Sequence, residues 1–436
     1  MRKCLIGLGL MIFALPTVVF SGGYEFGGLG AKAISMGGAF IGLADDWTSI
    51  YWNPAGLAQL EGRGAGSYLE YAIVRGRDEN SVANDDYLAQ AYGEPAKFNK
   101  DKIETEAILP SFGYWQRFGG FTLGTGIYTP NGNAIDWDDT ANDATGADIE
   151  ASYHTLLFIS VGNVSLAKEI TDNFSVGAGL NLVYGKFEVE IEKSYSSSAM
   201  PDTFSDYNFT NKMEGDGTGL EGVVGLLFRP SAKISIGGVI RSGSLLEMEG
   251  EGKGSLQGAT VEALGYAATE ESDYTQRFSY PATCGLGMAY KATPKLTLTC
   301  DWDRTYWNSM EEDIDFDKDT GDTEEAHTTL FLQDKDGSMN WSNTDRFRIG
   351  MEYRPNQAWS LRAGFFTDPS PVPAKGVDIT KLIDVDCKFI TLGAGYKKER
   401  WQVDLAYAHS SGEETLNGVK YTEDGDAVAL TGIYRF

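Results

Sequence analysis

The stretch WQVDLAY, residues 401–407, decides the fold class because its side chains alternate in character from one position to the next. Val403, Leu405 and Tyr407 form an apolar series, and the residues between them are polar or small. Successive side chains of a β-strand point to opposite faces, so a period of two indicates a strand with one apolar face. A soluble sandwich buries such a face and a membrane barrel turns it to lipid, so the connections between strands must separate the two.

About fourteen segments share this alternation, and their connections follow a regular order. The segments lie near residues 64–74, 105–118, 120–130, 151–168, 173–192, 217–230, 232–250, 273–291, 294–308, 340–354, 357–368, 387–397, 400–410 and 426–436. The connections alternate between short turns and long polar stretches. The short turns are residues 119–120, 170–173, 230–231, 293–294, 355–357 and 398–399. The long stretches lie near residues 75–104, 131–150, 193–216, 251–272, 309–339, 369–386 and 411–425. Short turns on one rim, long loops on the other and an even strand number are typical of outer-membrane barrels. The sequence therefore predicts an all-β fold, a 14-stranded antiparallel transmembrane β-barrel over residues 63–436.

The composition excludes several other classes of protein. The 436 residues include 36 Lys and Arg against 62 Asp and Glu, a formal net charge of −26 that would repel a nucleic acid. Aromatic residues make up 12% of the chain, whereas disordered acidic chains contain few. Only the N-terminus approaches the run of about 18 apolar residues that a transmembrane helix needs, so a polytopic helical protein is excluded.

Residues 1–21 carry the features of a cleaved signal peptide. Arg2 and Lys3 precede an apolar run over residues 5–20, and small residues follow it. The alternative is a membrane anchor, but the run is short and Pro16 interrupts it. We therefore expect an exported protein of a Gram-negative-type outer membrane. After cleavage it would keep three cysteines, too few for a disulfide framework: Cys284, Cys300 and Cys387.

Residues 22–62 break the alternation and are expected to form a separate unit. Glycine pairs and the motif Asn53-Pro54-Ala55-Gly56 interrupt any strand, and short helical turns over 31–36 and 55–60 fit between them. The segment is rich in aromatic and aliphatic residues, which would aggregate on an exposed tail. We predict that it packs inside the barrel as a partly helical plug.

Asn53 is the predicted anchor of this plug. Pro54 biases the residue before it toward extended backbone, and proline is tolerated at the first helical position because that position needs no N–H. We therefore expect Pro54 to begin a short helix. The Asn53 amide is predicted to hydrogen-bond the barrel wall rather than cap its own turn.

Several passages carry a resemblance to a known family. Residues 30–40 (GAKAISMGGAF) and 44–57 (ADDWTSIYWNPAGL) resemble the N-terminal hatch of the FadL/TodX-type outer-membrane transporters of hydrophobic compounds, which take up long-chain fatty acids and aromatic hydrocarbons. Residues 108–114, 340–355 and 365–373 are similar to later passages of that family, so the resemblance spans nearly the whole mature chain. Trp47 and Trp52 depart from it, since the family more often has smaller or other aromatic residues there.

The resemblance implies a plugged fourteen-stranded barrel and a transport route. Family members capture an apolar molecule at the outer face and release it sideways through a gap beside a kinked third strand, here residues 121–130. Gly124, Gly126 and Pro130 are the expected lateral-opening residues; the alternative is that the glycines relieve crowding and Pro130 ends the strand. The implied hatch and gating residues are Gly22, Phe26, Asn53, Pro54, Ala55 and Gly56.

The expected partners follow from this interpretation. They are a hydrophobic small molecule, the outer-membrane lipids with lipopolysaccharide, and the barrel assembly machinery. We expect a monomer that is not an enzyme and uses no cofactor, metal or nucleic acid, because the three histidines form no catalytic constellation and no P-loop or zinc spacing occurs. A surface adhesin or structural barrel and a general porin remain the alternatives.

Two sets of charged residues need separate interpretations. Arginine matches a carboxylate in bidentate geometry, so four arginines that are expected to face the lumen are candidates for a ligand head group: Arg241, Arg277, Arg348 and Arg362. The alternative is a lumenal ion-pair network with Asp301, Asp303, Glu352 and Asp404.

The acidic run Asp313, Asp315, Asp317, Asp319 and Asp322 has the spacing of a Ca²⁺ loop, but Gly321 falls one residue late and Ala326 replaces the ligating Glu. We expect a solvated loop there, with divalent bridging to anionic lipid as the alternative.

Overall fold

The computed structural model describes residues 22–79, 98, 100–142, 148–196, 206–265, 267–317, 332–380 and 382–436. The predicted signal peptide, residues 1–21, lies outside this part of the chain. The helical elements are α1 (Ala31–Ile34), α2 (Ser49–Trp52), η1 (Pro54–Gln59), α4 (Ala259–Leu264) and η3 (Trp307–Ser309). None of the helices in the described ranges is both long and apolar enough to cross a bilayer.

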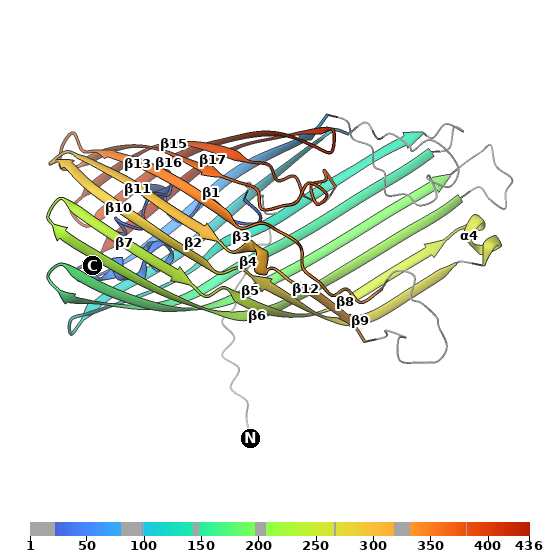
Figure 1. The fold of residues 1–436 in the computed structure, drawn as a ribbon, viewed down its shortest axis with the longest axis horizontal. Coiled ribbons are helices and arrows are strands. Elements are labelled where there is room, and N and C mark those ends of the chain that lie inside the picture. The colour runs from blue at the N-terminus through green and yellow to red at the C-terminus, as the bar shows by residue number, and fades with distance from the viewer. Residues whose placement is uncertain are drawn as a thin grey trace, which may run out of the picture.

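Seventeen strand segments make up the sheet in the described part of the chain (Figure 1). They are β1 (Arg63–Asp78), β2 (Lys102–Phe118), β3 (Phe121–Asn142), β4 (Asp148–Thr171), β5 (Phe174–Ser196), β6 (Asp206–Ser231), β7 (Ile234–Arg241), β8 (Ser244–Gln257), β9 (Ala268–Tyr280), β10 (Thr283–Thr293), β11 (Leu296–Thr305), β12 (Glu312–Phe316), β13 (Thr344–Tyr353), β14 (Trp359–Asp368), β15 (Cys387–Lys398), β16 (Trp401–Leu416) and β17 (Val419–Arg435). Neighbouring strands pair antiparallel, and β1 pairs with β17 from Gly64↔Arg435 to Asp78↔Tyr421. This last pairing closes the barrel.

The seventeen segments correspond to fourteen barrel strands, because three strands are interrupted. β7 and β8 are separated by two residues, as are β9 and β10, and residues 306–311 separate β11 from β12. The predicted fourteen-stranded barrel is confirmed. The prediction that residues 232–250 and 273–291 are each one continuous strand is wrong, whereas β11 runs unbroken through most of the predicted segment 294–308 and β12 lies beyond it. Gly243 has a φ of 70°, outside the strand region, and Pro281 has no N–H to give to a ladder.

Side chains alternate strictly between the inside and the outside of the barrel. On β13, Phe347 and Ile349 are 59% and 56% exposed, whereas Arg346 and Arg348 are each 4% exposed. Apolar side chains therefore face outward and charged ones face the lumen, which is the arrangement of outer-membrane barrels. The protein is accordingly an outer-membrane barrel whose apolar band contacts lipid.

The N-terminal residues 22–62 lie in the lumen. Their helices are near the short-turn end, where Figure 1 shows the blue helices beside the C-terminus, and residues 22–23 reach the loop between β14 and β15. Their apolar side chains join the main buried cluster, and full burial of one large apolar side chain stabilises a fold by about 1.5–3 kcal/mol. We call this segment the plug. The helix expected over 31–36 is the shorter α1, that over 55–60 is the 3₁₀ helix η1, and α2 was not predicted.

Because the barrel is closed, we expect the folded protein to resist denaturation by SDS. A closed ladder has no edge from which strands can unravel, and its backbone polar groups are satisfied within the barrel. We expect the unheated protein to migrate faster in SDS gels than the boiled protein. Identical migration of membrane-inserted protein before and after boiling would contradict the closed barrel.

Candidate functional site

The N-terminal segment, residues 22–26, is held by a side chain from the loop between β14 and β15. The Asp384 carboxylate accepts hydrogen bonds from the backbone N–H groups of Gly22 and Gly23, at 3.0 and 2.9 Å. Burial raises the pKa of the Asp384 carboxyl group to about 7, and the two N–H donors act in the opposite direction. The hold of this carboxylate on the segment therefore depends on its protonation near neutral pH.

Arg346 on β13 ties the same segment to the barrel wall. Its guanidinium forms ion pairs with Glu25 and with Asp368, and donates to the Gly22 carbonyl oxygen at 3.2 Å. Removing one partner of a buried ion pair leaves an uncompensated charge, which is costly. We call Asp384, Arg346 and Glu25 the N-terminal clamp.

The ladder between β2 and β3 is incomplete on the long-loop side. The two strands pair only as far as Phe112↔Ile127. Beyond that point β2 pairs with β1 as far as Lys102, and β3 pairs with β4 as far as Asn142. Backbone pairing between β2 and β3 therefore ends here, and we call this end of pairing their divergence. One side-chain bond still crosses it, since the Thr105 hydroxyl donates to the Ala134 carbonyl oxygen at 3.2 Å.

An extra residue in β3 marks the start of this divergence. Tyr128 pairs with Val161 and Asn131 pairs with Ile159, so two residues of β3, the second being Pro130, stand opposite one residue of β4. Such a β-bulge bends a strand and increases its twist. Pro130 adds to the disruption because it has no N–H for the ladder.

The bent part of β3 takes the N-terminal segment as its partner instead of β2. The Phe26 N–H donates to the Pro130 carbonyl oxygen at 2.9 Å, and the Gly132 N–H donates to the Tyr24 carbonyl oxygen at 2.9 Å. Segment 22–26 is thus bonded to the clamp on one side and to the bulged strand on the other. A movement of this segment must break both sets of contacts.

Of the three predicted lateral-opening residues, only Pro130 lies at the divergence. Gly124 and Gly126 stay in the regular β2–β3 ladder. A Cβ at either position would overlap plug side chains, Ile50 or Leu57. These two glycines relieve crowding between wall and plug, which is the alternative that the sequence left open for them.

A cavity of about 70 Å³ lies where the plug, the clamp and the bulged strand meet. Its apolar lining comes mainly from Tyr51 and Trp52 of the plug, Tyr128 and Pro130 of β3, and valines of the wall. Its charged lining includes Glu25, Glu221, Arg241, Arg346 and Arg348. We call it the lumenal cavity; it has room for only a few atoms, so a larger molecule must displace the plug or segment 22–26.

Known proteins share this arrangement of barrel and plug. The model of the family described as outer membrane protein transport protein (OMPP1/FadL/TodX) matches residues 22–433. The chain belongs to this family. It is 22% identical to the long-chain fatty acid transport protein of Escherichia coli O6:H1, an alignment that covers 97% of the chain and 94% of that protein.

Solved structures of this FadL/TodX family show the same fold. A Pseudomonas aeruginosa FadL homologue matches with a TM-score of 0.68 at 17% identity, over 95% of this chain and all (100%) of that one. The Pseudomonas putida toluene transporter TodX matches with a TM-score of 0.63 at 15% identity, over 95% and 99% of the two chains. The chain is therefore an outer-membrane barrel of a family that transports hydrophobic compounds.

In this FadL/TodX-family chain, two of the four predicted arginines border the lumenal cavity. Arg241 lies 3.8 Å from Glu221 and 5.0 Å above the centre of the Tyr51 ring. Arg348 pairs with Asp303 at 2.8 Å. Arg348 therefore pairs with a carboxylate of the expected lumenal network, whereas the partner of Arg241 lies outside that network; both arginines still line the cavity.

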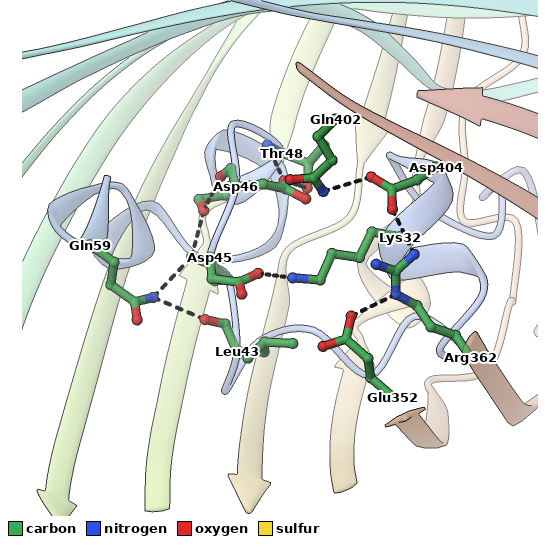
Figure 2. Close-up of polar contacts among 12 residues, drawn as sticks. Lys32, Leu43, Asp45, Asp46, Thr48, Gln59, Glu352, Arg362, Gln402 and Asp404 are labelled. Atoms are coloured by element: carbon green, nitrogen blue, oxygen red, sulfur yellow. Dashed lines mark hydrogen bonds and ion pairs between the residues drawn. The ribbon is translucent and has the colours of Figure 1, made fainter. Parts of the chain in front are cut away.

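Arg362 and Arg277 lie elsewhere. Arg362 joins Glu352 and Asp404, at 2.8 and 2.7 Å, on the side of the plug that faces the short turns (Figure 2). The prediction that Arg277 faces the lumen is wrong: it lies on the exposed face of β9, because its neighbours Gln276 and Phe278 take the buried face.

Polar groups of the plug and of the wall gather at this short-turn side (Figure 2). Lys32 of α1 pairs with Asp45 at 2.5 Å, and Gln402 of β16 donates to Asp404 at 2.7 Å. Burial lowers the pKa of Lys32, but Asp45 and other carboxylates outweigh it and raise the pKa overall. These groups border a cavity of about 570 Å³, which also reaches the turns at residues 294–295 and 356–358.

Asn53 bonds both the wall and its own turn. Its Nδ2 donates to the carbonyl oxygens of Ile41 in the plug and Leu226 in β6, both at 3.0 Å, and its Oδ1 accepts from the Ala55 N–H at 3.1 Å. The expected bond to the wall is present, and Pro54 begins η1; the prediction that Asn53 does not cap its turn is wrong. The close approach requires Gly225 on β6, where a Cβ would overlap Asn53.

The clamp was not predicted from the sequence, and only part of the acidic run lies within the described residues. Arg346 falls on the same strand face as Arg348, a signal that alternation offers, whereas Asp384 meets Gly22 across 362 positions and no local pattern predicts that contact. Asp313, Asp315 and Asp317 lie in or directly after β12. Asp319 and Asp322 lie outside the described residues, and within the described ranges no group of three or more His, Cys, Asp or Glu is placed to hold a metal ion.

Proposed function

We propose that the chain takes up hydrophobic small molecules, long-chain fatty acids or hydrocarbons, without energy input, and releases them sideways between β2 and β3. The observation that carries this proposal is the ladder that ends at Ile127 beside the lumenal cavity. The names of its relatives, a long-chain fatty acid transport protein and a toluene transporter, support both substrate classes.

The physical chemistry favours a lateral route over an axial one. An apolar molecule gains about 25 cal/mol for each Å² of surface removed from water, so it leaves an apolar pocket more readily for bilayer hydrocarbon than for the aqueous periplasm. An axial exit on the short-turn side would lead an apolar molecule past the charged groups at Lys32 and Arg362, which offer it no apolar contact. The divergence of β2 and β3 lies in the outward apolar band.

We further infer that segment 22–26 is the gate of this route. It is bonded to Pro130 at the bulge and contributes Glu25 to the lining of the lumenal cavity, which is too small for a fatty acid. A ligand that enlarges this cavity must push against the segment and its clamp. Binding and opening are then one event, which keeps the barrel closed to ions when empty.

Reconstitution tests this function against an adhesin and a general porin. We expect lipid vesicles that contain the protein to take up a labelled long-chain fatty acid or toluene faster than empty vesicles, and to show little steady ion current. An adhesin would leave uptake at the level of empty vesicles. A porin would pass ions and small sugars, and either result would overturn the proposal.

A further inference from the structure

The short-turn rim of the barrel is basic, although the whole chain is acidic. We define this rim as residues 61–63, 116–121, 168–174, 229–234, 291–296, 353–359, 397–401 and 434–436. It contains twelve of the 36 Lys and Arg residues of the chain but only four of its 62 Asp and Glu residues. Short turns face the periplasm in outer-membrane barrels, so the surplus of positive charge lies at the periplasmic membrane interface.

Three of the rim cations point outward, toward lipid rather than toward the lumen. Lys168 shares its strand face with Val164 and Leu166, which are 57% and 42% exposed. By the same alternation Arg63, the first residue of β1, and Lys398, the last residue of β15, lie on the outward faces of their strands. Among the described residues none of these three cations forms an ion pair with a carboxylate, so their charge is not compensated by the protein.

Each of these cations stands beside an outward aromatic ring. The Lys168 ammonium lies 4.8 Å from the centre of the Phe121 ring, and the Arg63 guanidinium 5.7 Å from that of Phe436. Lys398 pairs across strands with Trp401, which is 60% exposed. Aromatic side chains of barrels gather at the level of the lipid head groups, so the neighbouring cations lie at the depth of the lipid phosphates.

We propose that this rim binds anionic phospholipids of the periplasmic leaflet, through the phosphodiester of a head group with no compensating amine. A periplasmic protein would meet the tips of the turns, whereas Arg63, Lys168 and Lys398 lie on the lipid-facing surface. Basic residues near an anionic membrane surface contribute about fivefold in affinity each, an attraction that salt screens. The rim therefore prefers phosphatidylglycerol to phosphatidylcholine.

Native mass spectrometry of the folded protein in detergent, with added dioleoyl phosphatidylglycerol or dioleoyl phosphatidylcholine, tests this preference. We expect the parent to bind phosphatidylglycerol at least about fivefold more tightly. The combined variant Arg63→Gln, Lys168→Gln, Lys398→Gln is expected to bind the two lipids within about twofold, because it loses its outward cations. All three side chains are exposed, so the variant should remain heat-modifiable in SDS gels.

A matched variant separates local binding from net charge. Lys102→Gln, Lys253→Gln and Lys388→Gln together remove the same charge from exposed positions at the long-loop ends of β2, β8 and β15. We expect this variant to keep the preference of the parent. Equal binding of both lipids by the parent, or an equal loss in the two triple variants, would overturn the proposal.

Discussion

Deletion of Pro130 is expected to lower the uptake of a hydrophobic substrate by about tenfold or more while the barrel still folds. The deletion removes the extra residue of β3, so Tyr128 and Asn131 can pair with β4 in one continuous register. A straight β3 can then extend its ladder with β2 beyond Ile127. Each added hydrogen bond contributes about 0.5–1.5 kcal/mol, so reopening two of them costs about a tenfold factor in rate. Vesicle uptake measures the loss, and heat-modifiable migration shows that the variant is folded.

The substitution Pro130→Ala is the matched control for this deletion. It restores an N–H but keeps the extra residue, so the bulge and the divergence should persist and uptake should stay near that of the parent. The deletion could also impair uptake by removing the bond between the Phe26 N–H and the Pro130 carbonyl oxygen. Loss of that bond would loosen segment 22–26, and the ion current through the variant would then increase. Normal uptake by the deletion variant would show that the divergence of β2 and β3 is not the exit.

The barrel was predictable because its signal is repeated in every strand. A strand that separates lipid from a polar lumen must alternate at each position, so one stretch such as residues 401–407 already contains the rule. The strand interruptions were harder to predict. Gly243 and Pro281 were visible as breakers, but whether such a residue bends a strand or divides it depends on the neighbouring strands, which one sequence does not reveal.

The candidate site was predictable only where it is local. Pro130 and the Asn53-Pro54 pair act on their own backbone, so their type and order indicate what they do. The placement of Gly124 and Gly126 depends on which plug side chains stand opposite, and the clamp joins residue 22 to residue 384. Contacts of that kind follow from the closed fold and not from any spacing along the chain.

Replacement of Asn53 by alanine is expected to loosen the plug without unfolding the barrel. Asn53 is fully buried, and its loss leaves the carbonyl oxygens of Ile41 and Leu226 without this donor. An unsatisfied buried group costs about 1–3 kcal/mol, which is small against the stability of a closed barrel. The same free energy raises the population of a displaced plug by about 5- to 150-fold. We expect normal abundance in the outer membrane, a higher ion conductance in planar bilayers and altered uptake.

Asn53→Asp distinguishes an anchor from a turn residue, because the two side chains have the same shape. Aspartate keeps the oxygen that accepts from the Ala55 N–H and is among the best helix-capping residues, so a role limited to the turn would leave this variant like the parent. It has no N–H for Leu226, however, and places a second acceptor against the carbonyl oxygens of Ile41 and Leu226. Two acceptors in contact repel, so Asn53→Asp should leak at least as much as Asn53→Ala. If Asn53→Asp is as tight to ions as the parent, or if Asn53→Ala transports and conducts normally, the bond between Asn53 and the wall does not hold the plug.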